Sequence, residues 1–129
     1  MVGLVIVSHS TRIAQGVVEL DRQMAGDIPI FAAGGMDNGA LGTSLEKIQD
    51  AILQANPEEG VIILADIGSS VMTAQSAIEF LEMEGYDMSR VCLNRAALVE
   101  GSLVASVGMS IGRSFDEIID SLEPYQLEK

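Results

Sequence analysis

The segment Gly3-Leu-Val-Ile-Val-Ser8 opens the chain with an unbroken apolar run that is rich in β-branched residues. Three further short apolar runs follow it, at Ile28–Ala33, Val61–Ala65 and Val91–Leu93. An apolar run without alternation is typical of a strand that is covered on both faces. The four runs therefore predict the strands of a buried, mainly parallel sheet.

The segments between these runs carry apolar residues at helical spacing. The predicted stripes are Ile13, Val17, Leu20 and Met24; Leu45, Ile48 and Ile52; Val71, Ala74, Ile78 and Leu81; Val104, Val107 and Ile111; and, in a short last helix, Ile118, Ile119 and Leu122. Such a stripe is typical of the helix face that packs on a core. The chain is thus expected to alternate strands and helices along its length.

Local signals predict some of the helix boundaries. Thr43 with Glu46 and Ser114 with Glu117 have the spacing of capping boxes, in which two side chains satisfy free amides at a helix start. The last six residues, Pro124–Lys129, follow the final apolar residues, and we expect this tail to fray.

Alternating strands and helices indicate an α/β fold, namely a doubly wound, mainly parallel sheet of four to five strands with helices on both faces. We expect the strand order 2-1-3-4. The length of 129 residues suits one domain, and we found no repeat or linker, so residues 1–129 are expected to form a single unit.

Charge and cysteine content narrow the class of protein. The net charge of −12 argues against binding to nucleic acid or to an anionic membrane, since both depend on cationic contacts. It favours solubility, a basic protein partner, or both. One cysteine excludes an intrachain disulfide and fits a reducing compartment. No run is long enough to span a membrane, so a cytoplasmic location is expected.

The most informative loops follow the first and third predicted strands. In open α/β sheets, ligands bind at the carboxyl ends of strands where the strand order reverses. In the order 2-1-3-4, that rule brings the segment Ser8–Thr11 next to Asp66–Ser70. His9 and Asp66 are then expected to face each other, with the glycine-rich loop Gly34–Thr43 nearby.

His9 and Asp66 together suit nucleophilic chemistry at phosphorus. An imidazole attacks through its unprotonated nitrogen, and a carboxylate that accepts a hydrogen bond from the other nitrogen fixes the tautomer and orients the ring. Small residues at nearby helix starts let phosphate oxygens approach free amides. The candidate phosphate-binding residues are Ser10, Thr11, Thr43, Gly68, Ser69 and Ser70.

Each of these residues also has a purely structural interpretation. A lone histidine after a strand is more often a satisfied structural residue than a nucleophile. Asp66 has the spacing of a helix cap, and Ser10 and Thr11 fit the same role. The glycine-rich loop is compatible with a long turn. The convergence of His9 and Asp66 on neighbouring strand ends favours the functional interpretation.

Several other site classes lack their motifs. The chain has no phosphate-binding P-loop, no dinucleotide-binding glycine fingerprint and no Gly-x-Ser-x-Gly elbow of serine hydrolases. A receiver domain needs an acidic pair after the first strand, where this chain has Ser8-His9. With one histidine and one cysteine, the chain has too few of the ligands that make up a usual zinc site. We therefore expect neither a metal nor a cofactor.

Four short motifs together resemble a known family. Leu4-Val-Ile-Val-Ser-His9-Ser, Gly42-Thr43, Ala65-Asp66-Ile-Gly-Ser-Ser70 and Leu98-Val-Glu-Gly101 are similar to the phosphotransfer subunit of phosphoenolpyruvate-dependent dihydroxyacetone kinase. That subunit belongs to the mannose-type IIA superfamily of the sugar phosphotransferase system. The resemblance covers nearly the whole chain.

The resemblance implies a phosphotransferase component. His9 is expected to accept a phosphoryl group on its distal ring nitrogen, with Asp66 as its hydrogen-bond partner. The expected donor is the histidine phosphocarrier protein, and the expected acceptor is ADP bound to the nucleotide-binding subunit of dihydroxyacetone kinase. A homodimer is also implied. Since the sequence stops at Lys129, the carrier is expected to be a separate protein.

Two alternatives stay open at this point. The chain is compatible with a IIA domain that passes its phosphoryl group to a IIB domain of a mannose-type sugar transporter. It is also compatible with a non-catalytic α/β module that binds a small anion at the same helix starts. A relay protein must present its histidine to partners, so the carrier hypothesis predicts a shallow, exposed His9.

Overall fold

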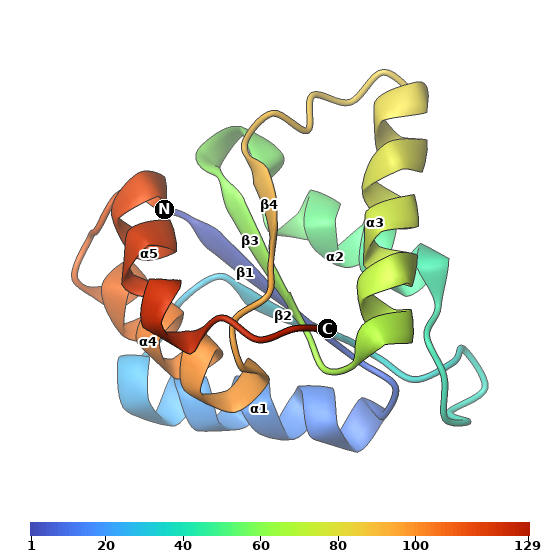
Figure 1. Cartoon of the computed structure of the whole chain (residues 1–129), viewed down its shortest axis with the longest axis horizontal. Helices are drawn as coiled ribbons and strands as arrows, with labels where there is room; N and C mark the ends of the chain where they lie inside the picture. Colours follow the sequence, from blue (N-terminus) through green and yellow to red (C-terminus); the bar gives the residue numbers. More distant parts are fainter.

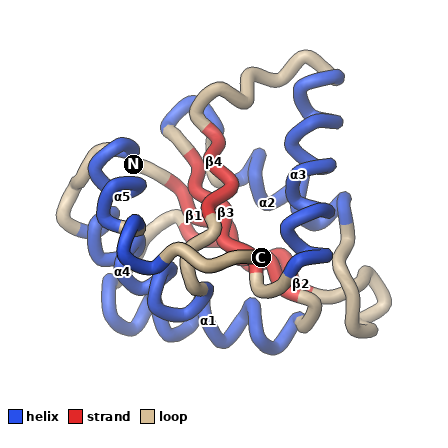
Figure 2. Tube along the Cα trace, viewed as in Figure 1, coloured by secondary structure: helices blue, strands red, loops and turns tan.

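Four parallel strands form the central sheet of the computed structural model, which describes residues 1–129 (Figures 1 and 2). The strands are β1 (Gly3–Ser8), β2 (Ile30–Gly34), β3 (Val61–Ala65) and β4 (Val91–Asn94). Their order is β2-β1-β3-β4, and all three pairings are parallel. The predicted strand order is confirmed, and β1 and β3 are neighbours at the sheet centre.

Helices cover both faces of the sheet, which confirms the predicted doubly wound α/β fold (Figure 1). They are α1 (Thr11–Ala25), α2 (Leu45–Gln54), α3 (Gly68–Met83), α4 (Leu98–Ser110) and α5 (Phe115–Ser121), with 3₁₀ turns at Pro57–Glu59 and Glu123–Tyr125. Helices α1, α4 and α5 pack on one face, and α2 and α3 pack on the other. None of these helices combines the length and apolar content needed to cross a membrane.

Strand β1 divides its apolar side chains between the two cores. Leu4 and Ile6 point to the α1 side, whereas Val5 and Val7 point to the α3 side. All four side chains are fully buried. Burial of each one stabilises the fold by roughly 1.5–3 kcal/mol, so β1 links both helical layers and holds the residues after it in a fixed place.

The predicted apolar stripes are confirmed for α2 and α3. They are only partly correct for α1 and α4, where Val17 lies in the core and Val104 packs against it. Ile48, Ile52 and all four predicted residues of α3 lie in the core facing α2 and α3. The predicted α1 and α4 stripes include large side chains that are instead exposed: Ile13 50%, Leu20 40%, Met24 61%, Val107 41% and Ile111 63%. These two helices bury a different face.

Small residues explain this difference. Helix α1 turns Ala14 and Asp21 inward, and α4 turns Ser102, Ala105 and Ser106 inward, all with no exposed surface. Small side chains let two helices approach closely, because fewer atoms separate their backbones. The large apolar side chains are displaced to the outer rim of this contact, so apolar spacing alone points to the wrong face.

One of the two predicted capping boxes is confirmed. Ser114 accepts from the Glu117 amide at 3.2 Å, and the Glu117 side chain accepts from the Ser114 amide at 2.9 Å. The prediction for α2 is wrong by one residue, because Ser44 is the cap and accepts from the Lys47 amide at 3.2 Å. The Thr43 hydroxyl is hydrogen-bonded to Thr73 instead.

The prediction that the C-terminal tail frays is also wrong. The Ala97 amide donates to the Tyr125 carbonyl at 2.8 Å, and the Leu127 amide donates to the Arg95 carbonyl at 2.9 Å. Ala96 and Gln126 form an antiparallel bridge. These backbone contacts seat the tail against the end of β4, and Figure 1 shows the C terminus near the start of α3.

Asp21 is the one acidic side chain that the fold buries completely. Neither carboxyl oxygen has a hydrogen-bond donor. Burial raises the pKa of Asp21 to about 6, although the nearby Ser102 hydroxyl offsets part of this effect. In the structure that hydroxyl donates to the Val99 carbonyl, so ionisation of Asp21 opposes folding.

We predict that Asp21→Asn stabilises the protein near neutral pH. The folded pKa of about 6 lies above the ordinary 3.8, so the ionisation penalty grows as pH rises between these values. The variant avoids this penalty, which amounts to about 3 kcal/mol from the pKa difference. Urea unfolding at about pH 7.5 should show the gain, and the gain should shrink towards about pH 4. Equal stability of the two proteins at the higher pH would contradict this prediction.

Candidate functional site

His9 lies directly after β1, at the carboxyl edge of the sheet. Its side chain is 24% exposed, so the ring is half-buried yet open to solvent. The backbone carbonyl of His9 accepts from the Gly42 amide at 2.8 Å, which holds the loop after β2 against it. The expectation of a shallow, exposed His9 is therefore met only in part, because one edge of the ring is enclosed.

The enclosed edge of His9 faces Asp66. The Nδ1 atom of His9 lies 3.0 Å from Oδ1 of Asp66. Asp66 follows β3, and the parallel pairing of β1 with β3 brings the two strand ends together. An ionised carboxylate only accepts hydrogen bonds, so this contact places the ring proton on Nδ1 and leaves Nε2 with a free lone pair.

Asp66 also accepts hydrogen bonds from residues on both sides of it in the chain. Its Oδ2 accepts from the Ser8 hydroxyl at 2.8 Å and from the His9 amide at 3.0 Å. Its Oδ1 accepts from the Ser70 hydroxyl at 2.6 Å and from the Ile67 amide at 2.8 Å. The carboxylate therefore connects the end of β1 with the start of α3.

These hydrogen bonds determine the ionisation of Asp66. Burial by itself raises the pKa of Asp66, but hydrogen bonds from Ser70, the His9 amide, Ser8 and the His9 ring outweigh it. Together they hold the pKa of Asp66 well below its ordinary value. The group is a carboxylate at any physiological pH, as the role of orienting the ring requires.

The exposed nitrogen of His9 faces the start of α3. The Ser69 hydroxyl is hydrogen-bonded to Nε2 of His9. Gly68 and Ser69 begin this helix, so their amides precede its first intrahelical bonds. Free amides and the positive end of the helix dipole favour an anion here. The site thus pairs a nucleophilic nitrogen with an environment suited to negative charge.

The other predicted phosphate-binding side chains have structural partners. The Ser10 hydroxyl caps α1 by accepting from the Ile13 amide. The Thr11 hydroxyl donates to the Gly34 carbonyl at 2.9 Å, and Thr43 pairs with Thr73 at 2.9 Å. The structure therefore brings Ser69 and Ser70 to the His9–Asp66 pair, whereas these three hydroxyls are engaged elsewhere in this state.

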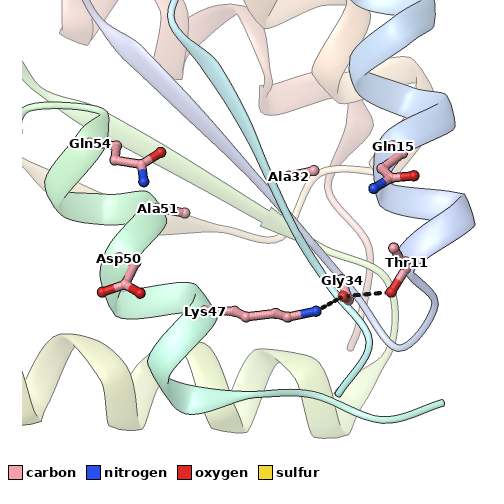
Figure 3. Close-up of a pocket in the computed structure, with 8 residues that line it drawn as sticks. All are labelled: Thr11, Gln15, Ala32, Gly34, Lys47, Asp50, Ala51 and Gln54. Carbon is pink, nitrogen blue, oxygen red and sulfur yellow. Dashed lines mark hydrogen bonds between the residues drawn. The ribbon is translucent and has the colours of Figure 1, made fainter. Parts of the chain in front are cut away.

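A small cavity of about 250 Å³ lies beside the site, between α1 and α2 at the end of β2 (Figure 3). Within it, Lys47 Nζ donates to the Gly34 carbonyl at 3.1 Å, and Thr11 donates to the same oxygen. A Cβ atom added to Gly34 would lie 2.6 Å from the Ser10 carbonyl oxygen. Lys47 and Gly34 therefore shape the loop next to His9 rather than reaching the ring.

Two features near the site escaped the sequence analysis. Ser8, predicted to lie near Asp66 but without a role in orienting it, donates to Asp66 and also accepts from the Ser10 amide at 3.0 Å. Lys129, assigned to a fraying tail, places its Nζ on the Ala65 carbonyl at 2.6 Å. The position of Ser8 at the carboxyl end of a predicted strand could have indicated its role. No local pattern connects Lys129 to a strand 64 residues earlier.

The fold and the site define a class of protein: an α/β domain that presents a histidine, oriented by an aspartate, at the switch point of a parallel sheet. The chain belongs to the EIIA-man family, described as PTS system fructose IIA component, which matches residues 3–119. This assignment confirms the resemblance to the mannose-type IIA superfamily.

Curated relatives of the chain include subunits of dihydroxyacetone kinase. It is 34% identical over 127 residues to the PTS-dependent dihydroxyacetone kinase phosphotransferase subunit DhaM of Lactococcus lactis, and each protein is covered to 98%. It is 39% identical over 123 residues to the phosphoryl donor subunit DhaM of Escherichia coli. That match covers 92% of this chain but 26% of the Escherichia coli protein.

A solved structure of a protein of unknown function has the same fold. Its TM-score is 0.83 at 28% sequence identity, and the match covers 98% of this chain and 96% of that one. The fold therefore recurs in a second protein of almost equal length.

Proposed function

We propose that this chain is a phosphohistidine carrier of a dihydroxyacetone kinase relay. His9 takes a phosphoryl group from the histidine phosphocarrier protein and passes it to ADP on the nucleotide-binding subunit of the kinase. The observation that carries this proposal is the contact of His9 Nδ1 with the Asp66 carboxylate, which leaves Nε2 free to act as the nucleophile. The names of the DhaM relatives support the choice of relay.

The proposed chemistry consists of two substitutions at phosphorus. First, the lone pair of His9 Nε2 forms a bond to phosphorus while the bond from phosphorus to the donor nitrogen breaks, and those electrons return to the donor ring. Second, a β-phosphate oxygen of ADP attacks phosphorus, and the bond to Nε2 breaks. Asp66 offsets the positive charge on the phosphorylated ring.

Ser69 exchanges partners during this cycle. Its hydroxyl is bonded to Nε2 in the resting state, so that contact ends when Nε2 binds phosphorus. The hydroxyl is then in position to donate to a phosphoryl oxygen, together with the first amides of α3. The phosphoryl group has one covalent bond to the protein, at Nε2, and the other contacts are hydrogen bonds. It therefore stays available for onward transfer.

Exposed apolar side chains next to the site favour proteins as exchange partners. Ile67 is 59% exposed and Met72 72% exposed, at the start of α3, and Leu41 is 80% exposed in the loop held against His9. Apolar side chains around a polar centre suit transient protein docking, since they add affinity without blocking the reacting group. A free sugar or nucleotide makes little use of such a rim.

We propose that the relay operates in the cytoplasm and that the chain forms a homodimer. The single cysteine suits a reducing compartment. The exposed residues Ile13, Leu20 and Met24 of α1 and Val107 and Ile111 of α4, the α1–α4 face, support self-association. Each copy carries a charge of −12, so two copies repel each other unless they meet at a weakly charged surface. Helix α4 fits this requirement because it contains one ionisable residue, Glu100.

The carrier proposal predicts one acid-labile phosphoryl group per chain after incubation with phosphoenolpyruvate, enzyme I and the phosphocarrier. Intact-mass measurement should detect this group in the wild type and not in His9→Gln. Addition of the ADP-loaded kinase subunit should remove the group, whereas a IIB domain should not. Phosphorylation of His9→Gln would contradict the role of His9, and release only to the IIB domain would move the chain to a sugar transporter.

The homodimer proposal predicts that Leu20→Glu yields monomers. Two carboxylates buried at the α1–α4 face would lack partners, which opposes association strongly. Sedimentation equilibrium should give twice the 13.7 kDa chain mass for the wild type and the chain mass for the variant. Met83→Glu is the matched control, because Met83 is 79% exposed on a helix of the opposite face. Dimers of Leu20→Glu would place the contact elsewhere.

A further inference from the structure

Lys129 brings a positive charge to the carboxyl end of the sheet. Its Nζ donates to the Ala65 carbonyl at 2.6 Å and to the Ala96 carbonyl at 2.7 Å. Ala65 ends β3 and immediately precedes Asp66, whereas Ala96 lies just after β4. The ammonium group therefore bridges the ends of two neighbouring strands, next to the residue that orients His9.

The chain holds Lys129 in this place through several contacts. Gln126 Nε2 donates to Asn94 Oδ1 at 2.8 Å, and Arg95 Nη1 donates to the Lys129 carbonyl at 2.9 Å. A Cβ atom added to Gly68 would lie 3.9 Å from the Lys129 carbonyl carbon. The end of the tail thus lies against the start of α3, near which Figure 1 shows the C terminus.

Anchoring the tail does not by itself require a charged group at this position. Burial lowers the pKa of Lys129, the Asp66 carboxylate raises it, and Arg95 lowers it further. Two carbonyl oxygens need only neutral N–H donors, and a charge that is partly removed from water carries a solvation penalty. Attraction to the Asp66 carboxylate offsets part of that penalty.

We propose that Lys129 is a positioning residue of the phosphoryl site, where its ammonium fixes the ionised Asp66 carboxylate and adds positive charge beside the arriving phosphoryl group. The second part of this role rests on the proposed function. Phosphorylation brings negative charge to His9, so a nearby cation stabilises the phosphorylated state more than the resting one. Lys129 touches neither the ring nor the phosphoryl group in this structure, and it acts through Asp66 and through its charge.

Two substitutions separate the charge of Lys129 from its hydrogen bonds. Lys129→Gln keeps N–H donors for the two carbonyl groups but removes the charge, whereas Lys129→Arg keeps both. Leu127→Ala is the matched control, because Leu127 is 53% exposed and the variant keeps both its backbone contact to Arg95 and the ammonium. Urea unfolding of each variant reports any loss of stability separately from the chemistry.

The test measures the initial rate of phosphohistidine formation with phosphoramidate, a small donor that needs no protein partner. We expect Lys129→Gln to be slower by about tenfold, because loss of one nearby, partly solvent-screened charge raises the barrier by about 1.4 kcal/mol. Lys129→Arg and Leu127→Ala should retain the wild-type rate. A wild-type rate for Lys129→Gln would overturn the proposal, and so would equal losses in Lys129→Gln and Lys129→Arg.

The same experiment distinguishes failure of this proposal from failure of the proposed function. If phosphoramidate modifies His9 but the relay proteins neither donate to it nor accept from it, the relay assignment falls and the comparison of variants still decides the role of Lys129. If His9 of the wild type accepts no phosphoryl group from any donor, both proposals are overturned.

Discussion

The Asp66 carboxylate is the interaction on which the site depends. It accepts hydrogen bonds from Ser8 and His9 at the end of β1 and from Ile67 and Ser70 at the start of α3. The strand order places these segments side by side, and the carboxylate fixes their relative positions to within hydrogen-bond distances. The same carboxylate orients the His9 ring, so one side chain both connects β1 with α3 and sets the geometry of the reacting group.

This arrangement explains why a mostly buried carboxylate stays ionised. Each donor that holds Asp66 also stabilises its charged form, and together these donors outweigh the effect of burial on its pKa. Asp21 is the opposite case, because it is fully buried without a donor and its pKa rises to about 6. The two aspartates thus differ in ionisation because Asp21 is fully buried without a donor, whereas Asp66 is surrounded by hydrogen-bond donors.

Close packing of α1 on α4 has consequences at the surface. Small residues such as Ala14, Ser102 and Ala105 fill the contact, and larger apolar side chains lie outside it. The same close approach leaves Asp21 buried beside Ser102. Several large apolar side chains of these two helices, among them Leu20 and Val107, consequently remain exposed. Helices α2 and α3, on the other face of the sheet, bury their large apolar residues in the usual way.

Local patterns were sufficient to predict the sheet, its strand order and the meeting of His9 with Asp66, because apolar runs and parallel topology determine which strand ends are neighbours. They failed where packing over long sequence separations decides. The buried faces of α1 and α4 include small residues, such as Ala14, Ser102 and Ser106, that carry little hydrophobic signal. Lys129 reaches the site only because backbone contacts of the tail with the end of β4 place it there.

Nitrogen NMR of the His9 ring tests the central claim most directly. The ¹⁵N shifts and long-range proton couplings of the ring assign the tautomer of the neutral imidazole and, after phosphorylation, the nitrogen that carries phosphorus. This account predicts a proton on Nδ1, held by Asp66, and phosphorus on Nε2. A neutral ring protonated on Nε2, or phosphorus on Nδ1, would contradict it, because Asp66 would then not determine which nitrogen is free to react.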